Sequence, residues 1–159
     1  MRENINLNTG WRFHKGDIAE PISQDKGFIY SQSKTERKLS GPAAYNYPDT
    51  PDSYGGRMIN PEKWVWTDLP HDYVVYQDND ENENCALGYL HYDNAWYRKH
   101  FNMPDGSENR RALLRFDGIA GKSTVYLNGC LMYHNFSAYN TFEIDITDYV
   151  YYDKENIIA

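Results

Sequence analysis

The sequence predicts an all-β fold, an antiparallel β-sandwich or jelly roll. Short stretches of alternating apolar residues recur along the 159 residues with turn residues between them, and none keeps a helical period of 3.6. Aromatic residues, which favour strands, make up 16% of the chain, and 15 residues are Tyr. Asn128-Gly129 stands between two apolar runs and predicts a two-residue β-hairpin, because both central residues of a type I′ turn need φ > 0. Short strands joined by frequent turns favour a sandwich over other β folds.

The first half of the chain predicts few strands and long connections. Residues 5–14 read as an extended segment that ends on Trp11-Arg12-Phe13. Residues 15–63 hold most of the prolines and predict a long, irregular excursion. Two short strands are expected at 64–69 and 73–76, and a second polar loop at 77–94.

The second half predicts strands in quick succession. Residues 95–103 alternate, with Tyr97 on one face of the strand and Trp96, Arg98 and His100 on the other. We interpret this second face as packing against the sheet. Further strands are expected at 112–116, within the hairpin 123–133, and at 142–147. Residues 157–159 look like the start of another strand, so we expect residues 1–159 to form one domain cut from a longer polypeptide.

Composition excludes several classes of partner. The net charge of −7 and the pI near 5.1 disfavour binding to nucleic acid or to an anionic membrane. Cys85 and Cys130 are the only cysteines, which is too few for a zinc site or a disulfide framework, and we expect both to be buried free thiols. Neither a signal peptide nor a membrane-length apolar run is visible, which favours a cytoplasmic location.

A set of short motifs follows in a fixed order and carries a family resemblance. The set is Asn8-Thr9-Gly10-Trp11-Arg12-Phe13, Leu69-Pro70-His71-Asp72-Tyr73, Trp96-Tyr97-Arg98-Lys99, Phe116-Asp117-Gly118-Ile119, Val125-Tyr126-Leu127-Asn128-Gly129 and Phe142-Glu143-Ile144-Asp145-Ile146-Thr147. This order closely resembles the N-terminal sugar-binding domain of glycoside hydrolase family 2, the family of β-galactosidases, β-glucuronidases and β-mannosidases. Structural roles are implied for Trp11, Pro70, Trp96, Tyr97, Arg98, Asp117, Gly118, Asn128, Gly129, Tyr139 and Asp145.

The resemblance implies a jelly-roll sandwich similar to galactose-binding domains. It also implies an immunoglobulin-like domain and a TIM barrel further along the polypeptide, with both catalytic carboxylates of a retaining glycosidase in the barrel. We therefore expect no catalytic residue, no metal site and no cofactor in this chain. Family members often have Gly-Gly-Tyr after the hairpin; here Tyr139 remains, but bulkier residues from His134 to Ala138 replace the glycines.

The loop before Trp96 holds most of the candidate substrate-contacting residues. Family members often bring this loop to the active site of the barrel, and Tyr89, Tyr92, Asp93 and Asn94 offer stacking surfaces and hydrogen bonds for a sugar. An ordinary tyrosine-rich loop is the alternative interpretation. His71 and Asp72 are further candidates, although Pro70-His71-Asp72 also fits a simple turn in which Asp72 bonds nearby backbone.

Asp78, Asp80 and Asn82 begin the spacing of a calcium loop, but this pattern breaks at the next positions. Glu83 stands where such a loop needs Gly, and Tyr89 stands where it needs Glu. We therefore interpret these residues as a solvated acidic loop.

Three functions fit the sequence. The first is an accessory domain of a β-galactosidase-like family 2 enzyme, which supports the barrel and helps to shape its sugar pocket. The second is a free-standing carbohydrate-binding module, which needs an exposed aromatic platform. The third is a protein-interaction domain, which needs an exposed apolar patch.

Overall fold

The computed structural model describes residues 3–18, 41–45, 47, 49 and 64–159. Most of the excursion expected at 15–63 therefore lies outside the described residues. The described part contains no α-helix, only strands and two short 3₁₀ turns, η1 (Gly41–Ala43) and η2 (Cys85–Leu87). Its strands are β1 (Trp11–Lys15), β2 (Val65–Thr67), β3 (Ala95–Phe101), β4 (Leu113–Phe116), β5 (Ser123–Leu127), β6 (Cys130–Asn135), β7 (Phe142–Asp145) and β8 (Asn156–Ile158).

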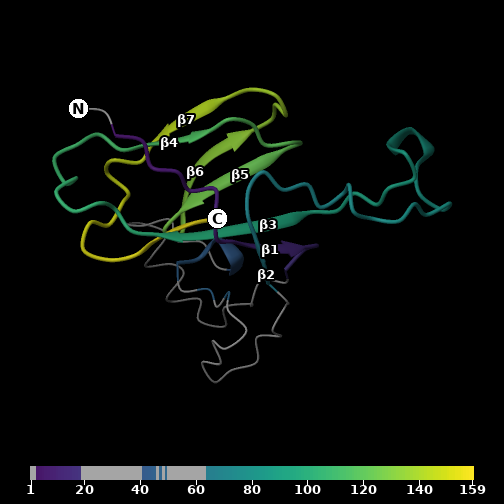
Figure 1. The fold of residues 1–159 in the computed structure, drawn as a ribbon, viewed down its shortest axis with the longest axis horizontal. Coiled ribbons are helices and arrows are strands. Elements are labelled where there is room, and N and C mark those ends of the chain that lie inside the picture. Colours follow the sequence, from purple (N-terminus) through teal and green to yellow (C-terminus); the bar gives the residue numbers. More distant parts are fainter. Residues whose placement is uncertain (1–2, 19–40, 46, 48, 50–63) are drawn as a thin grey trace, which may run out of the picture.

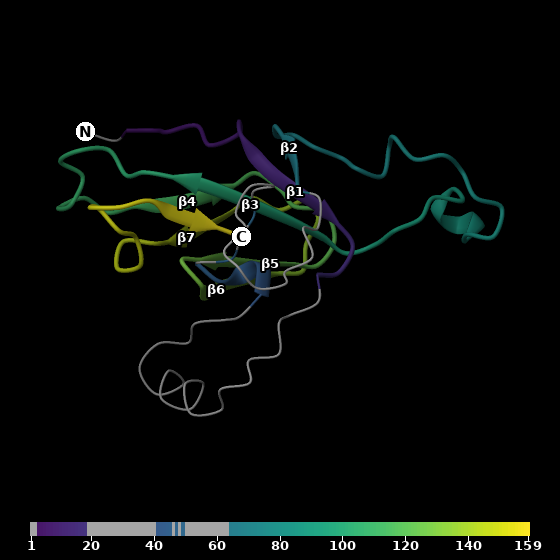
Figure 2. The ribbon, with the colours of Figure 1, turned by 90° about the horizontal axis from the view of Figure 1, so that it is seen from below.

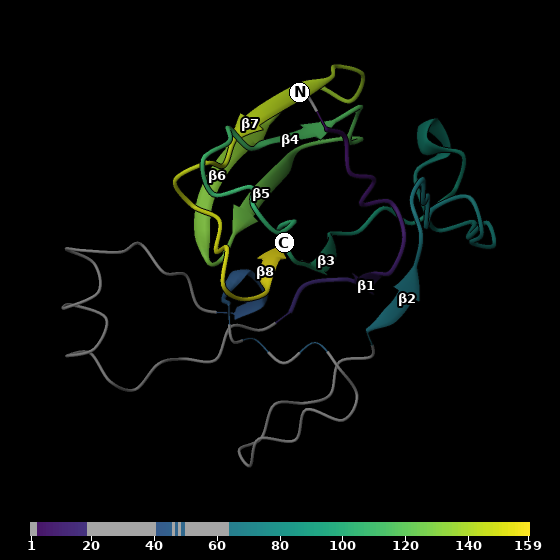
Figure 3. The ribbon, with the colours of Figure 1, turned by 60° about the vertical axis from the view of Figure 1, so that its left-hand side comes forward.

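The strands form two layers, and the predicted antiparallel sandwich is confirmed. One sheet has six strands in the order β2-β1-β3-β8-β5-β6, and the second pairs β4 with β7. Every strand pair is antiparallel. Figures 1 and 3 show β4 and β7 above the larger sheet. Strand β8 lies inside the large sheet between β3 and β5, so residues far apart in the sequence are neighbours there.

The predicted hairpin has the expected two-residue turn. Leu127 pairs with Cys130, and the residues between them, Asn128 and Gly129, have φ of 53° and 83°. Because an L residue is strained at such angles, Asn and Gly are the residues that fit this turn.

The Asn128 side chain ties the hairpin to the last strand. Its Nδ2 donates to Oδ1 of Asn156 and to the carbonyl of Tyr149, both at 2.9 Å, and its Oδ1 accepts the amide of Ile157 at 2.9 Å. Asn156 in turn bonds both the amide and the carbonyl of Tyr151. The two buried asparagines thus provide hydrogen-bond partners for backbone amides and carbonyls of β8 and of the segment that precedes β8.

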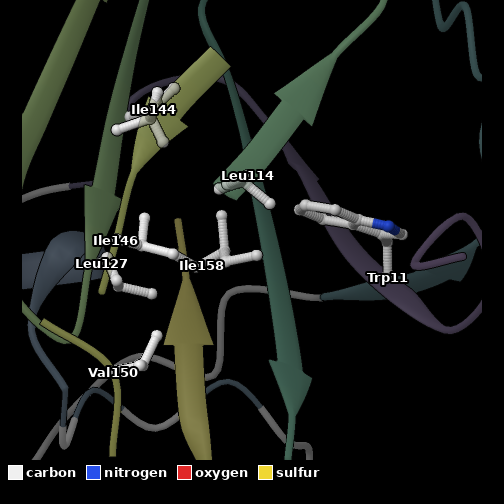
Figure 4. Close-up of a cluster of buried hydrophobic side chains, with 8 residues drawn as sticks. Trp11, Leu114, Leu127, Ile144, Ile146, Val150 and Ile158 are labelled. Carbon is white, nitrogen blue, oxygen red and sulfur yellow. The ribbon is translucent and has the colours of Figure 1, made fainter. Parts of the chain in front are cut away.

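Apolar side chains from both layers fill the space between them. Leu127 and Ile158 come from the large sheet, and Leu114 and Ile144 come from the small one (Figure 4). The buried cluster consists of Trp11, Leu114, Val125, Leu127, Ile144, Ile146, Val150 and Ile158. Tyr97, Phe101 and Met103, which alternation places on one face of the strand at 95–103, pack against this cluster.

Two expectations about individual segments were wrong. Residues 73–76 form a turn, not a strand: the amide of Val74 donates to Asp72 Oδ1 at 2.9 Å, and the amide of Gln77 donates to the carbonyl of Val74. The thiol expected to be buried at Cys85 is exposed, because η2 lies away from the sheets, whereas Cys130 is half-buried.

Candidate functional site

A long loop leaves the sandwich between β2 and β3 and forms its most prominent projection. Residues 77–94, called the arm below, extend past the ends of the strands in two perpendicular views (Figures 1 and 2). Asn84 caps η2 by accepting the amide of Ala86 at 2.8 Å, and Gly88 ends it in the left-handed conformation. The amide of Asp80 donates to the carbonyl of Tyr89 at 2.9 Å, so internal hydrogen bonds shape the arm.

The base of the arm is fastened to β1 and to the turn after β2. The amide of Gly16 donates to the carbonyl of Asn94 at 2.7 Å, and Asn94 Nδ2 donates to Asp17 Oδ1 at 2.7 Å. The Tyr73 hydroxyl donates to the carbonyl of Asp93. Asp93 and Asn94, both predicted from the sequence as sugar contacts, therefore lie at the attachment point.

Aromatic rings gather around Phe13 beside this attachment point. The Phe13 centroid lies 4.7 Å from His71, 5.5 Å from Tyr73 and 5.1 Å from Tyr97. His71 Nδ1 and the Tyr97 hydroxyl are 2.8 Å apart. Burial, with smaller contributions from Tyr73 and Asp72, raises the pKa of Tyr97 to about 12, so this hydroxyl keeps its proton. The rings form a rigid platform that positions the arm.

The candidate sugar-contacting residues fall into two groups. His71, Asp93 and Asn94 lie at the base of the arm, and so does Tyr92, which directly precedes Asp93 and is 53% exposed. Tyr89 lies within the arm, where its carbonyl accepts the amide of Asp80, and it is 44% exposed. Asp72 accepts a local backbone amide, as the turn interpretation predicted. The structure thus offers a hydrogen-bonded base that includes one exposed tyrosine and a second exposed tyrosine within the arm.

The arm carries negative charge. Residues 77–94 include several Asp and Glu residues but no Lys or Arg. Backbone and side-chain hydrogen bonds from Asn82 lower the pKa of Asp80, and His91 Nδ1 lies 2.7 Å from Glu83 Oε1. Within the described parts of the chain, no three His, Cys, Asp or Glu residues gather as a metal site.

The large sheet has a second face, which points away from the core and the small sheet. This face holds a buried ionic cluster that the sequence did not predict. Arg98 is completely buried, and its Nε donates to Asp49 Oδ2 at 2.8 Å. Arg12 Nη1 donates to Asp49 Oδ1 at 2.5 Å, and His100 Nε2 lies 2.7 Å from Asp49 Oδ2. Burial alone would raise the pKa of Asp49, but hydrogen bonds from His100, Arg98 and Arg12 outweigh burial and hold it well below the usual value.

The Asp49 cluster holds a covering segment on the sheet. The described residues 41–45, 47 and 49, called the strap below, lie over this face, and Arg98 Nη1 donates to the carbonyls of Pro42 and Ala44. Ile18, Tyr47 and Trp64 form a small buried cluster with Trp96 packed against it. Trp96, Arg98 and His100 share one face of β3, as the alternation placed them, but they pack against the covering segments: Arg98 and His100 contact the strap, and Trp96 packs against the small buried cluster.

The remaining motif residues lie at the end of β7 and in loops between strands. Asp145 accepts bonds from the Thr147 hydroxyl at 2.6 Å and Arg111 Nε at 2.8 Å, and these bonds lower the pKa of Asp145 to about 2. A Cβ on Gly118 would come 3.3 Å from the carbonyl of Ala138. Tyr139 in the bulky loop is 94% exposed, while Asp117 bonds the Arg115 side chain. Pro70 follows a cis peptide bond.

The fold and these turn motifs define a galactose-binding-like β-sandwich domain. Residues 62–159 match the family described as the glycosyl hydrolase 2 galactose-binding domain-like family. The chain belongs to this family. Within the described residues, no helix is both long enough and apolar enough to cross a membrane.

Known relatives are much longer than this chain. The chain is 27% identical to a β-glucuronidase of Formosa agariphila and 26% identical to a β-galactosidase of Bacteroides ovatus, with 99% of this chain covered in each case. It spans only 13% and 15% of those two proteins. A crystal structure of a β-glycosidase from Bacteroides vulgatus matches with a TM-score of 0.70 and 25% identity, covering 99% of this chain and 16% of that one.

Proposed function

We propose that this chain is the N-terminal accessory domain of a β-galactosidase-like glycosidase and that its arm forms part of the rim of the sugar pocket. The pocket itself, in this proposal, belongs to a TIM barrel that follows an immunoglobulin-like domain in the same polypeptide. This proposal rests on the structure of the arm. Hydrogen bonds from Tyr73 and to Asp17 hold its base, while Tyr89 and Tyr92 remain exposed. Exposed tyrosines on a fixed support suit stacking against a sugar.

The carboxyl groups of the chain support an accessory role. A general acid in a glycosidase needs a raised pKa, since it must hold a proton near neutrality. Hydrogen bonds lower the pKa of Asp49, Asp80 and Asp145 instead. These three carboxylates accept hydrogen bonds that hold the strap, the arm and the end of β7 in place, and we therefore place the hydrolytic chemistry elsewhere in the polypeptide.

The charge of the arm favours a neutral glycoside over an anionic one. A rim that carries carboxylates but no Lys or Arg repels the carboxylate of a glucuronide and leaves a neutral galactoside unaffected. The negative charge of the arm therefore supports a galactoside as the substrate, although a β-glucuronidase and a β-galactosidase are both among the relatives.

Single substitutions in the arm test the proposed rim. In the full-length polypeptide, Tyr92→Ala should raise KM for a nitrophenyl β-galactoside several-fold without changing the melting temperature. Tyr149→Ala is the matched control, because Tyr149 is 49% exposed but lies between β7 and β8. Equal KM values for the two variants would contradict a rim role for Tyr92.

A free-standing carbohydrate-binding module is the second candidate. Exposed aromatic side chains favour it: Trp66 on the edge strand β2 is 63% exposed, and the Arg12 guanidinium lies 4.8 Å from its ring centroid. Calorimetric titration of the 159-residue chain with β-galactosides distinguishes the two. Saturable binding that Trp66→Ala abolishes supports a module, whereas absence of binding supports the accessory domain.

A further inference from the structure

We propose that His100 is a pH-dependent latch that fastens the strap and the segment before β8 to β3 when its imidazole ring is protonated. This inference is independent of the glycosidase proposal, because it concerns the face of the sheet that the strap covers. It rests on the positions of two carboxylates around one histidine ring.

Both nitrogens of His100 face a carboxylate. Nε2 lies 2.7 Å from Asp49 Oδ2 in the strap, and Nδ1 lies 2.8 Å from Glu155 Oε2 just before β8. A neutral imidazole has one N–H, so it can donate to only one of these groups and must turn a lone pair toward the other. Only the imidazolium donates to both carboxylates, so the two short distances favour the protonated ring.

The charges around His100 favour this protonated form. Asp49 on the strap and Glu155 before β8 attract a proton, while Arg98 on β3 and Arg12 on β1 both donate to Asp49 and share its negative charge. The hydrogen bond that His100 donates to Asp49 raises the pKa of His100 from its ordinary value of 6.5, burial opposes this, and the hydrogen bond to Glu155 adds to the rise. Glu155 is about half exposed, so Asp49 is the better shielded partner.

Two interactions hold the strap on the sheet. The bonds from Arg98 keep their charge at physiological pH, whereas the bond from His100 depends on protonation of its ring. The Arg98 guanidinium bonds strap carbonyls and stays charged at all physiological pH values. The Tyr45 hydroxyl donates to the carbonyl of Glu155 at 2.8 Å, so strap and β8 segment touch each other beside His100. Loss of the His100 charge weakens one side of this contact while Arg98 keeps the other in place.

The strap also lies over the Asn128-Gly129 turn of the β5–β6 hairpin. A Cβ on Gly129 would come 3.5 Å from the amide nitrogen of Tyr45 and 3.8 Å from the carbonyl of Ala43. A change at His100 therefore reaches the β5–β6 turn through the strap backbone.

The direction of the pH effect follows from the raised pKa. The folded state binds the His100 proton more tightly than the unfolded chain does. The stabilisation is complete below the unfolded value of 6.5 and is lost as the pH rises through the higher folded value. The latch is closed in mild acid and opens as the pH rises through the folded pKa of His100.

NMR titration and hydrogen exchange on the 159-residue chain test the latch. The His100 ring resonances should titrate above pH 6.5. The amide of Tyr47, which donates to the carbonyl of Ala44, should be better protected at pH 6 than at pH 8.5 after correction for intrinsic exchange. His100→Gln should abolish this difference, because a neutral amide cannot replace the imidazolium.

Two further variants make the test decisive. His134→Gln is the matched control, since His134 lies on β6 and its ring nitrogen meets the Thr124 hydroxyl and, among the described residues, no carboxylate. It should leave the pH dependence of Tyr47 protection intact. Glu155→Gln should lower the pKa of His100 without removing the ring, which keeps the test valid if His100→Gln does not fold. A His100 pKa at or below 6.5, or equal Tyr47 protection at both pH values in the unsubstituted chain, would overturn the latch.

Discussion

Arg98 shows how one buried charge organises a whole face of this domain. Its side chain is completely buried, yet its donors meet Asp49 and strap carbonyls. Such a pair contributes little net stability over an apolar substitute, but removal of one partner leaves an uncompensated charge. The residue thus specifies where the strap lies more than it strengthens the fold.

Truncation of Arg98 should be far more costly than truncation of an exposed arginine. We expect Arg98→Met to lower the free energy of unfolding by about 3–5 kcal/mol, because Asp49 would remain buried and partly unpaired. Arg110→Met removes the exposed bond to Glu3 and should cost at most about 1 kcal/mol. Urea unfolding of both variants measures the difference, and equal losses would show that the Arg98 cluster does not hold the strap.

Tyr97 should ionise only well above the ordinary pKa of a tyrosine. Its pKa is raised to about 12 by burial, from an ordinary value of 10.0. Because the folded value is the higher one, its contribution to stability is complete below pH 10 and is lost as the pH rises toward 12. Ultraviolet titration should show a late phenolate component that Tyr97→Phe removes; a Tyr97 that ionises near pH 10 would contradict its placement against His71 and Phe13.

The sequence predicted which residues share the face of β3 under the strap, but not the residues that they contact. Alternation in the stretch 95–103 placed Arg98 and His100 on one face, since side chains in a strand point alternately to its two sides. Asp49 could not be predicted as their partner, because it lies 49 residues from Arg98 in a segment without strand periodicity. Long-range pairing of this kind depends on the path of the chain, which local patterns do not encode.

At the scale of elements, turn chemistry predicted structure better than alternation did. The Asn-Gly pair predicted both the hairpin and its two-residue turn, because the φ requirement is local. The stretch 73–76 resembled a strand in composition, yet Asp72 bonds the amide of Val74 and a turn results. An Asp side chain that competes for a backbone amide outweighed the β propensity of two valines.

The hairpin should depend on the Asn128 side chain as well as on its φ. Asn128→Gly keeps the turn conformation but removes the bonds to Tyr149, Asn156 and Ile157. We expect a loss of about 1–3 kcal/mol in unfolding free energy, because buried donors and acceptors lose their partners. The control is Asn140→Gly in the exposed β6–β7 loop, measured by the same denaturant titration. If both substitutions cost the same, the asparagine network does not tie the hairpin to β8.

At the scale of the whole molecule, the described residues form a scaffold with a projecting arm. The interior is filled by apolar side chains from both sheets (Figure 4), and Tyr73, one of the rings around Phe13, bonds the base of the arm, which projects from the sandwich (Figure 1). The ordered motifs in the sequence identified the family and the sandwich. The shape of the arm could not be predicted, because its path depends on bonds from Gly16, Asp17 and Tyr73 in distant segments.

Hydrolysis of nitrophenyl β-galactoside by the purified 159-residue chain tests the central claim, that this domain supports chemistry carried out elsewhere. The full-length polypeptide serves as the positive control, with nitrophenyl β-glucuronide as a second substrate. Our account predicts turnover by the full-length protein, faster for the galactoside, and none above background by the 159-residue chain. Turnover by the 159-residue chain in proportion to its concentration would contradict the account.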